Sequence, residues 1–237
     1  MKHRVVPVLL ATSAMALALT GCAGLAGDLG KTVTQDRDIS AATALSLRTS
    51  GDVTLTIGSE PSLTITAGDK VIDDLTSEVR NGVLILDEEG SRFGSLGRIT
   101  YALVLPSVEA ITVDGSGSID AELTTAETLS VAINGSGDLM GEGVDVTTLT
   151  AQIAGSGSAD LIGNAVREAV TIAGSGDFRG ADLVATDAAV VVEGSGGADV
   201  HVTGTLDAVI SGSGSITHTG GATVTSNVSG SGNVEEG

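Results

Sequence analysis

The segment Val131-Ala132-Ile133-Asn134-Gly135-Ser136-Gly137-Asp138-Leu139 decides the fold, because its pattern returns through the second half of the chain. Aliphatic residues precede the first glycine at alternate positions, and another follows shortly after the second glycine. Such a near-constant repeat indicates one small structural unit that is copied along the chain. Gly-Ser-Gly recurs at nearly equal spacing and starts at Gly115, Gly135, Gly155, Gly174, Gly194, Gly212 and Gly230.

Each repeat predicts a strand, a Gly-Ser-Gly corner, a short strand and a variable loop. Alternation of aliphatic and polar residues is typical of a strand with one buried face. A unit of about 20 residues has no room for a crossover helix, so strands of successive units must pair in parallel with the next copy. We therefore expect an all-β parallel β-helix (a β-solenoid) of about seven Gly-Ser-Gly coils, with a less regular β-rich amino-terminal portion.

The corner glycines are predicted to have a structural role. A corner between two sheets needs unusual backbone dihedrals, often with positive φ, that only glycine adopts freely. We expect such conformations at Gly135 and Gly155 in particular. The full set of corner glycines is Gly115, Gly117, Gly135, Gly137, Gly155, Gly157, Gly174, Gly176, Gly194, Gly196, Gly212, Gly214, Gly230 and Gly232.

The segment from Met1 to Cys22 carries the features of an export signal. A basic start, Met1-Lys2-His3-Arg4, precedes an apolar stretch from Val5 to Leu19. That stretch is shorter than the roughly 20 apolar residues of a membrane-spanning helix, so residues 1–21 are predicted to be a lipoprotein signal peptide. Leu19-Thr20-Gly21-Cys22 resembles a bacterial lipobox, which predicts a lipid on Cys22 and an anchor in the membrane. The alternative is a plain signal peptide with an incidental cysteine, although Cys22 is the only cysteine in the chain.

The rest of the chain divides into a lipidated tether at 22–32, an amino-terminal β portion at 33–108 and the repeats at 109–237. Within the β portion, Leu45–Val53 resembles a degenerate first coil, with Ser50-Gly51 in place of Gly-Ser-Gly. Residues 69–79 are expected to hold a single short helix. The remainder of this portion reads as further strands, with an acidic, glycine-rich loop at 87–97.

Composition excludes several partners. The net charge is -19 at pH 7, which disfavours nucleic acid and anionic lipid head groups by simple repulsion. Aromatic residues make up 1% of the chain, so sugar binding through ring stacking has little support. No glycine-rich loop is followed by Lys or by a helix, so the sequence predicts no phosphate site and no cofactor.

Acidic residues and histidines are the remaining candidates for a site. Asp138, Asp160, Asp177 and Asp199 follow successive corners and are predicted to form an outward acidic stripe that keeps the molecule soluble. A weak cation site or a carboxylate pair for glycoside hydrolysis are the alternatives. His201 and His218 are separated by close to one coil, and could stack on one face. They make a weak case for a metal, and no metal site is predicted.

The order of these elements resembles a known family. Ser50-Gly-Asp-Val-Thr-Leu55, Pro61-Ser-Leu-Thr-Ile65, the segment 77–85 and a strand ending in Leu105-Pro106 precede the serial Gly-Ser-Gly units. Together they are similar to the head GIN domain family, whose members are labelled "putative autotransporter adhesins". The resemblance covers roughly residues 33–237. It implies a right-handed parallel β-helix, placement outside the cytoplasm and a role in adhesion, and it supplies no catalytic motif.

The sequence therefore predicts a lipid-anchored, non-catalytic β-helix on the extracytoplasmic face of the cell membrane, serving adhesion or envelope interaction. Its expected partners are the membrane, through Cys22, and an envelope glycan or protein. The first alternative is a carbohydrate-active β-helix enzyme, and the second is a structural spacer or accessory subunit. We expect a monomer, because Glu235 and Glu236 would protect the carboxyl-terminal edge by charge. The competing expectation is that this edge is an interface.

Overall fold

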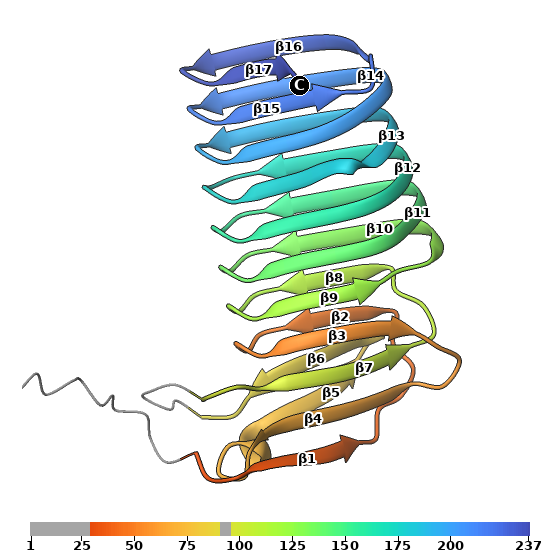
Figure 1. Ribbon diagram of the computed structural model, residues 1–237, viewed down its shortest axis with the longest axis vertical. Helices are drawn as coiled ribbons and strands as arrows, with labels where there is room; N and C mark the ends of the chain where they lie inside the picture. Colours follow the sequence, from red (N-terminus) through yellow and green to blue (C-terminus); the bar gives the residue numbers. More distant parts are fainter. Residues whose placement is uncertain (1–28, 91–95) are drawn as a thin grey trace, which may run out of the picture.

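The computed structural model describes residues 29–90 and 96–237. The predicted signal peptide and Cys22 lie outside this part of the chain. The described residues form strands and one short 3-10 helix, and the strands join into one 17-stranded sheet that winds into a solenoid. Figure 1 shows the coils stacked into a rod on a less regular base. The prediction of an all-β parallel solenoid is confirmed.

Seven Gly-Ser-Gly corners divide the wound sheet into two faces of the solenoid. We call these faces the pre-corner sheet and the post-corner sheet, by their position relative to the corner. The pre-corner sheet holds the strand segments that lead into each corner, and the post-corner sheet holds those that leave it. In four coils, those of β11 (Asp138–Ile153), β12 (Ser158–Ile172), β13 (Asp177–Gly194) and β14 (Gly197–Gly212), one long strand bends from the post-corner sheet into the pre-corner sheet. Register shifts mark the bend. The solenoid strands are β8 (Ala110–Val113), β9 (Ser118–Glu122), β10 (Thr125–Ile133), β11 (Asp138–Ile153), β12 (Ser158–Ile172), β13 (Asp177–Gly194), β14 (Gly197–Gly212), β15 (Ser215–Thr219), β16 (Thr223–Gly230) and β17 (Asn233–Glu236).

Inward residues stack into aliphatic ladders because every strand pairs in register with its copy one coil away. Ile133 pairs with Val113 on one side and with Ile153 on the other, and all three are buried. Ile172, Val192 and Ile210 continue this ladder. The buried residues form one continuous cluster from the base through the coils.

The base is not stacked in chain order. The coil β2 (Ala44–Leu47) and β3 (Asp52–Ile57) pairs in parallel with β8 and β9 on one side. On its other side it pairs with β6 (Val83–Glu88) and β7 (Thr100–Leu105). The Leu45–Val53 coil is therefore first in the sequence and second in the stack, as the neighbouring ribbons in Figure 1 show.

Antiparallel strands cover the lower end of this stack. β4 (Ser62–Gly68) pairs with β7 and with β1 (Thr32–Arg37), and β5 (Leu75–Arg80) pairs with β6. The prediction of a short helix over 69–79 is wrong in extent. Only Ile72–Asp74 forms a 3-10 turn, because the alternating residues after it pair with β6 as β5.

Backbone crowding explains the corner glycines better than their dihedrals do. A Cβ on Gly155 would overlap the carbonyl oxygen of Gly135, and a Cβ on Gly135 would overlap that of Gly115. Positive φ occurs at the first glycine of the last three corners only, with 144° at Gly194, 139° at Gly212 and 123° at Gly230. The expectation of positive φ at Gly135 and Gly155 is therefore wrong, and close stacking of backbone on backbone is the reason for glycine there.

Candidate interaction surfaces

The four aspartates predicted as one stripe lie on two separate ladders of the post-corner sheet. Asp138 pairs with Ser118 and is hydrogen-bonded to Ser158, and Asp177 pairs with Ser158 and Gly197. Asp160 and Asp199 belong to the next outward ladder, where both pair with Arg179. The spacing between consecutive aspartates is alternately longer and shorter than one coil. Each aspartate is therefore displaced by two positions along the strand relative to the one before it. The prediction of a single stripe is wrong for this reason.

The ladder nearest the corner alternates carboxylates with hydroxyls. Asp138 Oδ1 accepts hydrogen bonds from the backbone N–H and the hydroxyl of Ser158, at 2.9 and 2.6 Å. Asp177 Oδ1 accepts one from the backbone N–H of Gly197 at 3.0 Å. These carboxylates therefore join one coil to the next. The ladder runs through Asp52, Ser118, Asp138, Ser158, Asp177, Gly197, Ser215 and Asn233.

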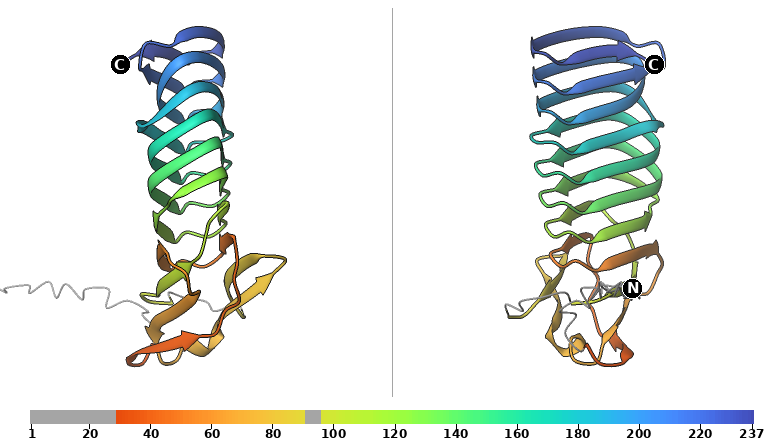
Figure 2. Two further views of the ribbon diagram at one scale, coloured as in Figure 1. Left: turned by 90° about the vertical axis from the view of Figure 1, so that its right-hand side faces the viewer. Right: turned by 60° about the vertical axis from the view of Figure 1, so that its left-hand side comes forward.

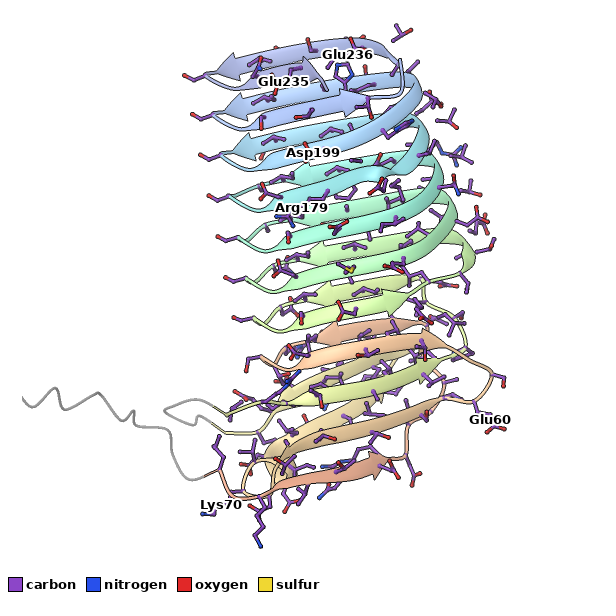
Figure 3. All side chains as sticks on the ribbon, in the orientation of Figure 1. Glu60, Lys70, Arg179, Asp199, Glu235 and Glu236 are labelled. Carbon is purple, nitrogen blue, oxygen red and sulfur yellow. The ribbon has the colours of Figure 1, made fainter. Side chains whose placement is uncertain are left out.

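The second ladder places Arg179 between two carboxylates. Its guanidinium lies 3.6 Å from Asp177 on its own strand. Figure 3 shows Arg179 and Asp199 on consecutive coils of the rod. Since Arg179 separates Asp160 from Asp199, positive and negative charge alternate along this part of the ladder.

Met140 interrupts the acidic surface. It is 45% exposed and pairs with Asp120 and Asp160 in the coils on either side. Two shallow grooves, of about 200 and 240 Å³, flank it. An apolar side chain rimmed by carboxylates offers both an anchor for a partner and a preference for positive charge. The grooves are lined by Asp120, Glu122, Asp138, Met140, Glu142, Asp160 and Arg179, among others.

The pre-corner sheet presents apolar as well as charged residues on its outward face. Its outward residues near the corner include Ala189, Val191 and Val209, of which Val209 is 39% exposed. A groove of about 340 Å³ crosses this sheet between Thr148 and Asp207. Around this groove, Asp187 Oδ1 accepts hydrogen bonds from Thr205, and Arg167 donates one to Thr148.

Glu168 is a buried acid that the sequence reading missed. It is 3% exposed, and neither carboxylate oxygen has a hydrogen-bond partner. It occupies an inward ladder position between Leu149 and Ala188, and desolvation raises its pKa to about 8. Aligning the repeats on their glycines would have revealed it, because the matching positions in the strands β10, β11, β13 and β14 hold Leu129, Leu149, Ala188 and Leu206.

The two histidines do not stack. His201 pairs with Thr219, whereas His218 pairs with Val200. The partner of His201 therefore lies one position beyond His218, and this mismatch turns the two rings to opposite faces of the strand. Within residues 29–90 and 96–237, no group of three or more His, Cys, Asp or Glu side chains is placed to hold a metal ion. In the same part of the chain, no helix has the length and apolar character to cross a membrane.

Solved structures share this architecture. An adhesin from Bacteroides fragilis, described as putative, superposes with a TM-score of 0.83 at 23% identity, covering 87% of this chain and 97% of that chain. A "putative lipid binding protein" from Parabacteroides distasonis gives 0.74 at 22% identity, with 88% and 97% covered. A "putative adhesin" from Parabacteroides merdae gives 0.65 at 20% identity, again with 88% and 97% covered. At these identities the likeness establishes the fold alone.

The sequence itself identifies the family. No curated protein sequence matches the chain. A family model matches residues 42–222, which include the β2–β3 coil, the base strands that follow it and most of the Gly-Ser-Gly coils. The chain therefore belongs to the family described as "Putative auto-transporter adhesin, head GIN domain".

Proposed function

We propose that this protein is a lipoprotein anchored through Cys22 on the extracytoplasmic face of the cell membrane, where its solenoid serves adhesion or envelope interaction without catalysis. The family description supports a surface role. The lipobox-like segment supports the anchor, since a diacylglycerol pair holds a protein durably at a bilayer.

The arrangement of the outward ladders is the observation that carries the proposal. The same outward position recurs in each coil at about 4.8 Å, the spacing of neighbouring strands. Several carboxylates and hydroxyls of the outward ladders form hydrogen bonds with each other across coils, and these bonds keep the pattern of side chains fixed. A fixed, repeated pattern suits weak contacts made many times along an extended partner, where avidity supplies the strength.

The direction of the rod fits an anchor at its base. β1, which follows the tether, lies in the base, and β16 and β17 lie at the opposite end (Figure 1). A lipid on Cys22 would then leave the coils pointing away from the membrane.

The anchor is tested by fractionating cells that express Cys22→Ser. We expect the substituted chain to stay unprocessed or to be released, while the native chain remains with membranes until detergent is added. A Ser13→Ala variant, with its change inside the signal peptide but outside the lipobox, serves as the matched control. If Cys22→Ser is processed and associates with membranes as the native chain does, the lipid anchor is wrong.

The interaction role is tested by binding the purified mature chain to a panel of envelope glycans and envelope proteins. We expect binding to fall several-fold in Met140→Ser, which removes the apolar anchor between the acidic grooves. Val209→Ser is the control, because Val209 is similarly exposed but lies on the pre-corner sheet. Equal losses in both variants, or binding by neither native chain nor variants, would count against the Met140 face.

The groove of about 240 Å³ favours one alternative, a carbohydrate-active enzyme. It brings Asp120, Asp138, Asp160 and Arg179 to one surface. Asp138 is engaged by Ser158, and Met140 stands between Asp120 and Asp160 in the register. Release of reducing ends from an envelope polysaccharide, lost in a double Asp120→Asn and Asp160→Asn variant, would support catalysis over adhesion.

A further inference from the structure

Four strands of the described chain pair on one side only. They are β1 and β5 in the base, and β16 and β17 at the opposite end. Each therefore presents free backbone N–H and C=O groups to its surroundings, and such an edge is a template for another strand. Figure 2 shows β16 and β17 as the terminal coil of the rod.

β16 differs from the other three open strands in carrying no charge. β1 contains Asp36 and Arg37, and β5 contains Glu78 and Arg80. β17 contains Glu235 and Glu236, which Figure 3 places at the same end of the rod. β16 reads Thr-Val-Thr-Ser-Asn-Val-Ser-Gly, with neither a charged residue nor a proline. At 8 residues it is also the longest of the four. The charged residues and prolines that usually prevent edge pairing are therefore absent from the longest open edge.

Two of the inward positions of β16 are apolar and uncovered, and Ser226, which pairs with the buried Ala208, lies between them. Val224 continues the ladder of Leu206, and Val228 continues the ladder of Ile210. Leu206 and Ile210 are fully buried, whereas Val228 is 42% exposed because no further coil of the described residues lies over it. A strand added to this edge would cover both valines and bond to the free backbone groups at once.

We propose that the free edge of β16 is a docking site for an extended segment of a partner protein, with aliphatic residues at alternate positions and no acidic residues. The alternation follows from the ladders, since only aliphatic residues at the inward positions can pack over Val224 and Val228. The exclusion of acids follows from the net charge of -19 and from Glu235 and Glu236 on the adjoining strand. This mode is strand addition, in which backbone bonds give affinity and alternate side chains give specificity.

A second copy of this chain fits the edge poorly. A two-fold pairing of β16 with its copy would also bring β17 against its own copy. Glu235 and Glu236 of both chains would then meet at the junction, and like charges directly opposite each other destabilise a strand pair. A partner segment that covers β16 alone avoids this repulsion.

The test uses the full chain purified from membranes in mild detergent and a fluorescein-labelled peptide. The peptide copies Thr128–Asn134 and has one added amino-terminal lysine, because this segment already stacks in the coils and is free of acids. We expect saturable binding by fluorescence anisotropy and slowed amide hydrogen exchange in β16. A peptide with proline at the position copied from Val131 should not bind, since proline removes a backbone donor.

Val228→Lys should weaken peptide binding at least about tenfold, because it puts a charge where the added strand packs. Val209→Lys is the matched control, being 39% exposed on the same sheet but one coil away from the edge, and should leave binding unchanged. If circular dichroism shows that Val228→Lys is misfolded, the proline peptide and the hydrogen-exchange pattern of the native chain still test whether the peptide docks on β16.

Three results would overturn the proposal. They are the absence of saturable binding, exchange protection that falls outside β16, and a native chain that sediments as a dimer through this edge. The inference goes beyond the proposed function. A Cys22→Ser variant that keeps the native processing and membrane association would refute the anchor but would say nothing of the β16 edge. A peptide that does not bind would refute the docking site on β16 but would say nothing of the anchor.

Discussion

The corners require glycine because the backbone of the preceding coil leaves no room for a Cβ atom. This crowding determines how much a single substitution at a corner destabilises the protein. The second glycine of a corner also lies against backbone of the preceding coil. A Cβ on Gly157 would overlap the carbonyl oxygen of Gly137, and one on Gly137 would overlap that of Gly117. The contacts are with backbone, which cannot rotate away as a flexible side chain can.

Gly155→Val should therefore lower the free energy of unfolding by about 1–3 kcal/mol, the usual cost of forcing extra atoms into a packed site. Ser156→Val at the same corner is the control, because the Ser156 side chain is exposed. Chemical denaturation of both variants measures the difference. An unchanged midpoint for Gly155→Val would show that the coils can separate to admit a side chain.

Glu168 makes stability depend on pH. Its folded-state pKa of about 8 lies above the ordinary value of 4.5 because burial disfavours the charged form. Among the described residues, no other charged side chain is buried, so no buried charge compensates it. Between these two pKa values the unfolded chain releases a proton that the folded chain keeps. The stability that Glu168 contributes is then fully present below about pH 4.5, and is lost as pH rises through about 8.

Glu168→Leu should raise the melting temperature at pH 8 and flatten its fall with pH, since leucine already fills the matching position at Leu149. The slope removed is at most about 1.4 kcal/mol per pH unit. Glu193→Leu, at an exposed position of β13, is the control and should keep the slope. Melting curves from pH 5 to pH 9 make the comparison, and parallel curves for native chain and Glu168→Leu would contradict the assignment.

At the scale of the strand, outward carboxylates act as links between coils. Asp138 Oδ1 takes two hydrogen bonds from Ser158, and Asp187 Oδ1 takes two from Thr205 in the same way. Each bond joins residues one coil apart, so it adds to the ladder of backbone bonds instead of competing with it. The acidic side chains therefore do more than keep the surface solvated.

Asp138→Ala should destabilise the protein by about 0.5–1.5 kcal/mol, the net value of a hydrogen bond. The exposure of Asp138 places the effect toward the lower end of that range. Asp199→Ala removes the same charge from an exposed position on the neighbouring ladder and is the control. Equal effects of the two substitutions on the unfolding free energy would reduce the role of Asp138 to its charge alone.

The sequence predicts the strands well because a period of two and a repeated corner are local properties. It does not predict which ladder a residue joins, since that depends on the length of each loop. Asp138 and Asp160 are separated by slightly more than one coil, and this small excess places them on different ladders, because Asp138 is hydrogen-bonded to Ser158 and Asp160 pairs with Met140. His201 and His218 are separated in the same way, because their spacing is slightly shorter than one coil. Aligning the repeats residue by residue recovers both results, whereas counting coils does not.

At the scale of the molecule, the stacking order of the base was beyond sequence reasoning. The β2–β3 coil lies between β6–β7 and β8–β9, so the chain passes down to the base and returns. Alternation identifies β6 and β7 as strands, but the pairing of β2 with two partners is a long-range choice. The base closes its end with antiparallel strands, and the terminal coil has no such cover among the described residues.

The terminal coil decides whether rods associate. Its two strands differ, because β16 is neutral and β17 carries Glu235 and Glu236. A two-fold contact between rods must pair both strands, so the glutamates should keep the native chain monomeric even though β16 is open. Asn233 donates a hydrogen bond to Glu235 at 2.9 Å, which holds that carboxylate beside the edge.

Replacing Glu235 and Glu236 together by valine should remove this barrier and produce concentration-dependent association of the chain from residue 23 onward. Glu193→Val combined with Glu127→Val is the control, since it removes equal charge from exposed positions away from the edge. Light scattering across a dilution series measures both variants and the native chain at ordinary salt. A native dimer would mean that the glutamates do not guard the edge. A double mutant that stays monomeric would mean that the edge needs no guard, and that the exposure of β16 alone is too little for two rods to hold together.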